Sequence, residues 1–300
     1  MVDVLLSVAI GEVLWDVFEK KRCLGGAPLN FAYHLNQLGE SLVTSTFVSR
    51  VGDDKQGDEI VSKLEQLNIT TEFVQRDNKH PTGRVDVGLD RLGQPTYSFD
   101  QNSAWDFITL TDRLKKLAAS TDIVCFGSLA QRNRVSSGTI DGFLKETRRN
   151  CLRIFDCNLR RDFYTKEVIE NSLEYANILK INENELFTIC NLFSICGVQE
   201  RRLSQILDRF DLKLIVLTMG EMGSLLFSPH ESSIQKPDKI DIVDTVGAGD
   251  AFTAAVAIGL LKGWELDYTN FCANVVGGFV CGQKGATPRL PNNIKNLFKQ

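Results

Sequence analysis

The amino-acid sequence predicts an α/β protein with a doubly wound, mainly parallel sheet flanked by helices. Three observations carry this prediction. The 300-residue chain is 43% hydrophobic, short apolar runs alternate with amphipathic stretches, and a glycine-rich turn separates an apolar run from a helix-favouring one. Apolar strands that alternate with helices are typical of a parallel sheet covered on both faces. A chain of this length and apolar content can bury the core of one large domain.

The expected elements follow in order along the chain. Apolar runs bounded by turn signals predict strands, and apolar positions three or four residues apart predict helices that glycine can end. The predicted strands are 4–10, 42–51, 123–126, 153–155, 177–181 and 214–218, with a β-like run at 240–243. The predicted helices are 29–38 (ended by Gly39), 55–67, 135–149, 166–175, 183–192, 201–210 and 251–262.

One segment departs from this alternation. Residues 83–106 contain two β-type runs, 84–91 and 96–99, joined through Leu92-Gly93-Gln94-Pro95, which predicts a β-hairpin. Apolar residues alternate with polar or small ones along the first run, so one face of the hairpin should be exposed. Such a hairpin is either a lid over a site or an ordinary sheet edge, and the pattern favours neither.

Composition excludes several classes of function. The 34 basic and 38 acidic residues give a net charge of −4, which provides no general attraction to nucleic acid or to an anionic membrane. No apolar run reaches the ~20 residues of a membrane span, and the first ten residues predict a buried strand rather than a signal peptide. The eight cysteines include no CxxC pair, so we expect reduced core thiols in a cytoplasmic protein and no zinc site.

The most specific local pattern is Asp244-Thr245-Val246-Gly247-Ala248-Gly249-Asp250-Ala251-Phe252. A glycine turn at a helix N-terminus presents free N–H groups and suits a phosphate or a developing anion. A carboxylate there would repel a phosphate, but it could accept the proton of a hydroxyl that attacks the phosphate. The alternative is that Asp250 simply caps the helix. Neither GxxxxGK[ST] nor GxGxxG after the first strand is present, so a P-loop or dinucleotide site is not predicted.

Three more polar or aromatic residues are candidates for the same site. Asp16 lies in a short loop, 11–16, after the first strand, and Asn30 lies at the start of a helix. Ligands of open α/β sheets bind beyond the carboxyl ends of the strands, where these side chains could converge with Asp250. Singly, Asp16 could be a surface carboxylate and Asn30 a helix-start residue. Trp105, near the end of the hairpin, either covers a ligand bound at this site or packs under the lid.

The glycine pattern resembles the second signature of the ribokinase/PfkB family of carbohydrate kinases. The stretch 25–30, followed by 50–54 and Gly57, resembles the first signature, and the two lie in the family's order. This resemblance covers essentially the whole chain. It implies a ribokinase-like fold in one domain over 1–300: a doubly wound (Rossmann-like) sheet with a small β-sheet lid from about 14–24 and 83–106.

The resemblance also implies a role for each matching residue. Asp250 would be the base, the N–H groups of Gly247, Ala248 and Gly249 the anion hole, and Arg160 would face the phosphate. The sugar would contact Asp16, Gly26, Asn30 and Asn158, with Trp105 as the additional candidate. The nucleotide would lie near Asn182, Thr218, Gly220, Gly223 and, by a loose match, Asn274. Glu185 would organise Mg²⁺ through water, and Asp244 would help to hold a monovalent cation.

Within the family, the stretches 11–16, 104–106 and 156–160 are most similar to bacterial fructokinases. This similarity implies ATP as donor, Mg²⁺ and a small-molecule sugar, with fructose expected first. The alternatives are ribose, 2-keto-3-deoxygluconate, a nucleoside or a sugar phosphate as acceptor, or a catalytically silent sugar-binding protein.

Two residues depart from the family pattern. Cys157 stands where fructokinases often have proline. Arg289 stands where ribokinase has a small hydroxyl residue, and this second difference leaves K⁺ dependence open. Because family lids often pair between subunits, we expect a homodimer.

Overall fold

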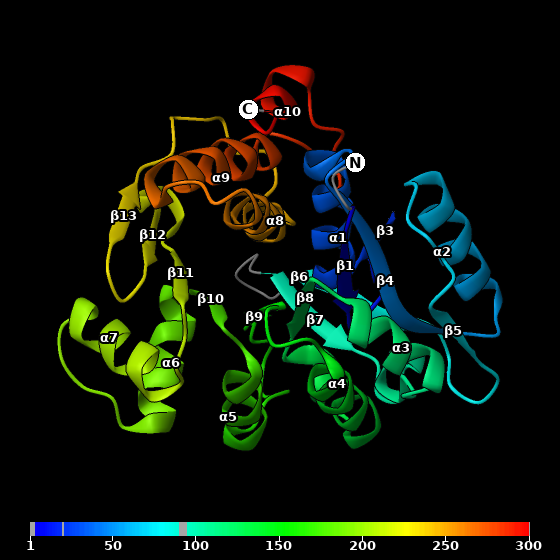
Figure 1. The fold of residues 1–300 in the computed structure, drawn as a ribbon. Helices are drawn as coiled ribbons and strands as arrows, with labels where there is room; N and C mark the ends of the chain where they lie inside the picture. The colour runs from blue at the N-terminus through cyan, green and yellow to red at the C-terminus, as the bar shows by residue number, and fades with distance from the viewer. Residues whose placement is uncertain (1–3, 20, 90–94, 300) are drawn as a thin grey trace.

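A nine-stranded sheet runs through the centre of the molecule, and four further strands form a separate sheet (Figure 1). This computed structural model describes residues 4–19, 21–89 and 95–299. The large sheet has the order β13 (Ser232–Gln235), β12 (Ser224–Phe227), β11 (Leu214–Thr218), β10 (Ile178–Asn182), β9 (Leu152–Asp156), β8 (Ile123–Gly127), β1 (Leu5–Ile10), β4 (Val43–Gly52), β5 (Val74–Asp77). The small sheet has the order β3 (Arg22–Gly25), β2 (Leu14–Val17), β6 (Gly83–Leu89), β7 (Pro95–Phe99).

The large sheet is parallel from β5 to β11, and only β12 and β13 pair in the antiparallel sense. The chain runs from β1 outward to β4 and β5 and then returns to β8 on the other side of β1. The loops that leave β1 and β8 therefore diverge. In open α/β sheets, such a topological switch point is where ligands bind, beyond the carboxyl ends of the strands.

Helices cover both faces of the large sheet (Figure 1). One face carries α1 (Ala27–Gly39), α2 (Lys55–Gln66), α8 (Ala248–Leu261), α9 (Leu266–Cys281) and α10 (Asn292–Leu297). The other carries α3 (Asp112–Ser120), α4 (Arg134–Glu146), α5 (Lys166–Tyr175), α6 (Glu183–Phe193) and α7 (Gln199–Arg209). Short 3₁₀ turns occur at η1 (Ala104–Phe107), η2 (Leu129–Gln131) and η3 (Gly220–Met222). Each face has its own buried apolar cluster, which explains why the central strands are apolar on both sides.

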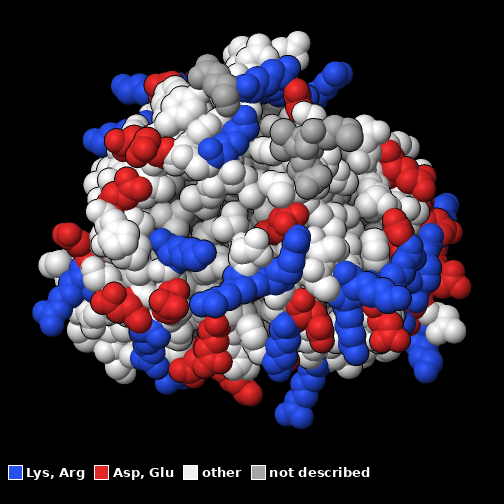
Figure 2. Space-filling view, in the orientation of Figure 1, with Lys and Arg blue, Asp and Glu red and all other residues white. Residues whose placement is uncertain are grey.

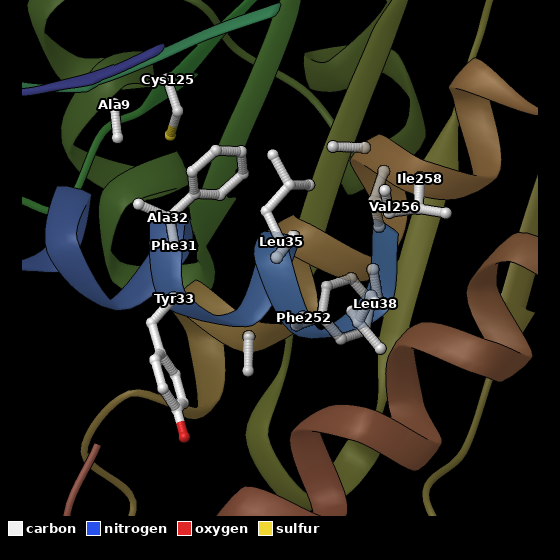
Figure 3. Close-up of a cluster of buried hydrophobic side chains, with 14 of the residues drawn as sticks. Ala9, Phe31, Ala32, Tyr33, Leu35, Leu38, Cys125, Phe252, Val256 and Ile258 are labelled. Atoms are coloured by element: carbon white, nitrogen blue, oxygen red, sulfur yellow. The ribbon is translucent and has the colours of Figure 1, made fainter. Parts of the chain in front are cut away.

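The packing of α1 against α8 fixes the geometry that matters most for the site. Phe31 and Leu35 of α1 and Phe252 and Val256 of α8 belong to one cluster of buried side chains (Figure 3). Each of these side chains is at most 5% exposed. Because this apolar contact holds the two helices together, their N-terminal turns lie side by side although the sequence separates them by more than 200 residues.

The doubly wound sheet and the separate small sheet confirm the predicted fold class, and most predicted elements begin and end within a few residues of the observed ones. Two local predictions are wrong. The loop expected at 11–16 ends at residue 13, because 14–17 form strand β2, which pairs with β3 and β6 in the small sheet that the family resemblance implied for 14–24. Residues 240–243 form no strand; they are exposed, and the N–H of Val243 donates to the carbonyl of Cys281 at the end of α9.

The predicted hairpin is present, since β6 and β7 pair antiparallel with Val85 opposite Phe99. Its expected turn, 92–95, lies mostly outside the described residues. All eight cysteines are free thiols, and five of them are buried. No helix among the described residues is long and apolar enough to cross a membrane. Acidic and basic side chains are interspersed over the face shown in Figure 2, in keeping with the small net charge.

Candidate active site

The glycine turn at the start of α8 is the centre of the site. Gly247 is the N-cap of α8 and adopts φ 81°, a left-handed conformation that glycine adopts without strain. A Cβ at this position would lie 2.6 Å from the Cα of Ala286, so the turn also needs glycine for space. The N–H of Ala248 donates to the carbonyl of Thr245 at 3.3 Å, whereas those of Gly247 and Gly249 have no partner among the described residues. The turn therefore presents free donors at a helix N-terminus, where an anion is stabilised.

Asp250 lies in the first turn of α8, three residues after the N-cap, so the alternative role as N-cap is wrong. Its Oδ2 accepts a hydrogen bond from Asn30 Nδ2 at 2.8 Å, across 220 residues of sequence. Burial and, next, the negative charge of Asp156 raise the pKa of the Asp250 carboxyl to about 6, against the opposing effects of Lys180, Asn30 and Arg160. A carboxylate with a pKa near neutrality is suited to accept a proton during catalysis.

The Gly25-Gly26 turn lies at the start of α1 and packs closely against the segment that carries Asp16. Gly26 is the N-cap of α1 with φ 130°, and a Cβ there would collide with the carbonyl oxygen of Glu12. Asp16, on β2, lies against Gly25, which likewise leaves no room for a larger residue. Burial raises the pKa of the Asp16 carboxyl to about 6, and the positive charge of Arg160 opposes that shift. The two glycines thus allow the segment from Glu12 to Asp16 to approach the start of α1 closely.

Glu12 is a buried acid that sequence reasoning did not assign to the site. It follows β1 and is 3% exposed; its Oε1 accepts the N–H of Ala27 at 3.3 Å, and its Oε2 has no partner among the described residues. Burial raises the pKa of the Glu12 carboxyl to about 7. With Asp156 and Asn158 it lines a cavity of about 10 Å³ at the switch point between β1 and β8. The pair Gly11-Glu12 was visible in the sequence, but nothing local indicated that the side chain turns inward.

Arg160 and Asn158 lie in the loop after β9. Asn158 has φ 39°, and the next residue, Leu159, donates its N–H to Glu185 Oε1 at 2.9 Å. Arg160 is exposed, but its charge opposes the rise in the pKa values of Asp16, Glu12 and Asp250, so it faces these three acids. The loop therefore places one cation beside the candidate base, as expected for a residue that faces phosphate.

Glu185 forms a capping box at the start of α6. Its Oε2 accepts the N–H of Asn182 at 2.8 Å, and Asn182 Oδ1 accepts the N–H of Glu185 at 2.9 Å. Together with Leu159, both oxygens of Glu185 thus have backbone partners, and the residue is only 5% exposed. No group of three His, Cys, Asp or Glu suited to a metal ion occurs in the described part of the chain. The carboxylate oxygens of Glu185, already bonded to backbone N–H groups, do not fit direct coordination of Mg²⁺. A role of Glu185 through water stays a prediction.

The predicted nucleotide residues form a second group at the ends of β10 and β11. Thr218 pairs with Asn182 in the register of these strands, and its Oγ1 lies 3.4 Å from the carbonyl oxygen of Ile181. Gly220 and Gly223 have positive φ; Gly220 begins the η3 turn and Gly223 follows it. Asn274 of α9 donates to the hydroxyl of Ser224, directly after Gly223, at 2.7 Å. The structure therefore brings these predicted residues together at one edge of the site.

Two further residues predicted for the site, Trp105 and Asp244, contact other parts of the protein. Trp105 is 1% exposed and packs against Gly83 and under the guanidinium of Arg132, whose centre is 4.0 Å from the ring centroid. No face of its indole is open to a ligand in this conformation, and its contact with sugar stays a prediction. Asp244 accepts hydrogen bonds from the N–H groups of Val246 and Gly285 at 3.1 and 3.2 Å, so it orders the segment before the glycine turn.

A doubly wound sheet with a small accessory sheet, and a carboxylate beside a glycine turn at a helix N-terminus, define the class of sugar-phosphorylating α/β enzymes. The chain belongs to the pfkB family of carbohydrate kinases, which matches residues 4–293. It is therefore a sugar kinase of that family, and a phosphotransferase with an alcohol group as acceptor.

Individual relatives agree with this assignment. An uncharacterized sugar kinase of Pyrococcus horikoshii is 31% identical over 97% of this chain and 91% of its own length. Its structure in complex with ATP superimposes with a TM-score of 0.80 over 94% of each chain. A fructokinase of Salmonella typhimurium is 28% identical (94% of this chain, 95% of its own). An ATP-dependent 6-phosphofructokinase of Thermoanaerobacterium thermosaccharolyticum is 27% identical (97% and 93%).

Proposed function

We propose that the protein is an ATP-dependent fructokinase in which Asp250 accepts the proton of the sugar hydroxyl. The observation that carries the proposal is the 2.8 Å hydrogen bond from Asn30 to Asp250, which joins the two family signatures at one point. Asn30 Nδ2 holds one carboxylate oxygen, so the other oxygen is left to receive a proton. The glycine turn lies beside the same carboxylate and supplies the donors for the phosphoryl group.

The chemistry follows from this arrangement. Asp16 and Asn30 hold sugar hydroxyls and orient one of them toward Asp250. As that hydroxyl attacks the γ-phosphorus of ATP, Asp250 takes its proton, and the bond from phosphorus to the bridging oxygen of ADP breaks. The free N–H groups of the turn and the charge of Arg160 stabilise the negative charge on the transferring group. The group around Thr218, Gly223 and Asn274 is the proposed nucleotide site. Mg²⁺, if bound, would accompany the ATP phosphates, and no step is assigned to it.

One observation favours an unphosphorylated sugar over a sugar phosphate. A phosphate-bearing acceptor needs additional free cations near the sugar pocket. Among the hairpin residues that the structure describes, Arg84 is the arginine, and its guanidinium pairs with Asp86 of the same strand. This pairing leaves Arg84 partly neutralised, which supports fructose rather than a fructose phosphate as the acceptor.

We also propose that the small sheet is a lid. Its strands β2 and β6 carry Asp16 and Gly83, which packs on Trp105, so movement of the sheet would move part of the sugar site. Closure over the sugar would exclude water from the phosphoryl transfer and suppress ATP hydrolysis. The homodimer expected from the sequence stays a prediction.

The test of the function is ADP release with ATP and Mg²⁺ across fructose, ribose, glucose, 2-keto-3-deoxygluconate, adenosine and fructose phosphates. We expect the highest kcat/KM with fructose. A higher value with another acceptor would replace the substrate and keep the mechanism. No turnover with any acceptor would contradict the proposal that the chain is an active fructokinase.

A further inference from the structure

A buried ion pair lies directly beneath the catalytic turn. Lys180 of β10 and Asp156 of β9 are register partners in the large sheet, and Lys180 Nζ lies 3.0 Å from Asp156 Oδ1. Their side chains are 9% and 6% exposed. Burying two charges is costly, and an apolar pair of the same volume would often stabilise a fold as well or better. The presence of this pair at this place therefore calls for a function other than stability.

The ion pair is in contact with the backbone of the turn. A Cβ built on Gly249 would lie 3.1 Å from Lys180 Nζ, so the ammonium group packs against the last residue of the Gly247–Gly249 turn. Thr253 completes the connection, because its hydroxyl donates to the carbonyl of Gly249 at 2.8 Å and lies 3.3 Å from Asp156 Oδ2. Lys180, Asp156 and the first turn of α8 thus form one connected unit.

The charges around Asp250 come from several elements. Glu12 follows β1, Asp156 belongs to β9 and Arg160 to the following loop, and Lys180 belongs to β10; Asn30 of α1 is the neutral hydrogen-bond donor. Glu185 of α6 faces Lys180 and Asp156. Lys180 is therefore the buried cation in a group of acids, and Arg160 is the exposed one. Removing either partner of the pair changes the electrostatic potential at Asp250, and the two removals change it in opposite directions.

We propose that Lys180 and Asp156 are positioning residues for phosphoryl transfer: Lys180 favours the ionised form of Asp250, Asp156 opposes it, and their pairing keeps Asp250 ready to take up a proton near neutral pH. This inference rests on the proposed role of Asp250 as the base. Neither residue needs to touch the substrate. The structural alternative is that the pair only holds β9 and β10 together, in which case losing either residue would have the same kind of effect.

The experiment follows the titration of Asp250 by ¹³C-carboxyl NMR in the unliganded protein, with Asp250→Asn used to assign the signal. We expect Lys180→Met to move the midpoint to higher pH and Asp156→Asn to move it to lower pH, each by about one unit. Arg132→Met is the matched control, because it breaks a second buried ion pair, with Asp106, away from the turn. Its midpoint should equal that of the wild type.

Kinetics provide a second readout. The acidic limb of kcat should move in the same two opposite directions, with kcat at pH 5 about tenfold lower in Lys180→Met than in the wild type. If Lys180→Met unfolds because the buried charge of Asp156 has lost its partner, the double variant Lys180→Met/Asp156→Asn is measured instead. It removes both charges and should fold, and its titration midpoint should lie between those of the single variants.

Midpoints that move in the same direction, or do not move, would overturn the proposal. Opposite shifts in the NMR titration of a protein that shows no kinase activity would support the ion pair's role and refute the proposed reaction. The failure of one proposal can therefore be told from the failure of the other.

Discussion

Replacing Asp250 by asparagine should abolish most of the activity and, at the same time, stabilise the fold. The amide introduced by Asp250→Asn keeps an oxygen that can accept the hydrogen bond from Asn30, so the sugar site should stay in place. What the variant loses is the proton acceptor, and general-base catalysis contributes about 10²–10⁴ in rate. We therefore expect kcat to fall by about that factor, with sugar affinity changed little.

The stability gain follows from the pKa of Asp250, which the folded protein raises from 3.8 to about 6. Because the folded state disfavours the charged form, the carboxylate costs stability above pH 6, and this cost disappears as the pH falls below 4. A pKa difference of about two corresponds to about 3 kcal/mol at pH 8, as an upper value. For 300 residues, an unfolding entropy of about 2 cal/mol/K per residue converts this to a rise in Tm of about 5 °C.

The assay is thermal unfolding of wild type and variant at pH 8 and pH 4, together with kcat at pH 8. We expect the Tm difference of about 5 °C at pH 8 to shrink to about 1 °C at pH 4. Asp241→Asn, an exposed residue before the turn, controls for the loss of a charge and should change neither quantity. A variant with normal kcat would refute the role of Asp250 as base. A Tm difference independent of pH would refute the electrostatic account.

Three further outcomes test other parts of the site. Gly247→Ala should lower kcat at least tenfold and destabilise the fold, because its Cβ would meet Ala286, whereas Gly263→Ala, also at positive φ but with open space, should lower Tm only slightly. Glu12→Gln should raise the urea midpoint at pH 8 but not at pH 4, since the pKa of the buried carboxyl lies near 7 and the charged form is the costly one; equal effects at both pH values would contradict this. Hydrogen exchange in β6 and β7 should slow when fructose is added, and unchanged exchange would argue against a closing lid.

Local sequence patterns predicted the doubly wound sheet and most of its central strands and helices, whereas α3, β12 and β13 were not predicted. The strand from 214 to 218 and the helix from 166 to 175 are predicted residue for residue, because their apolar spacing and flanking polar residues act within a few positions. The two glycine signatures likewise locate the N-terminal ends of α1 and α8, where positive φ and close approach favour glycine. The local pattern alone predicted a loop at 14–16, and only the family resemblance assigned this segment to the small sheet, because one partner of the strand at 14–17, β6, lies nearly 70 residues away.

The chemistry of the site was predictable only in part. The sequence by itself determined the two turns, the candidate base and the family, since each of these is encoded in contiguous residues. Only the tertiary structure decided that Asn30 donates to Asp250, that Glu12 points inward, that Trp105 is buried, and that Lys180 lies beneath Gly249. These facts depend on how α1, α8 and neighbouring strands pack. A charged residue in an apolar strand has the same local sequence whether its side chain reaches solvent or a buried partner.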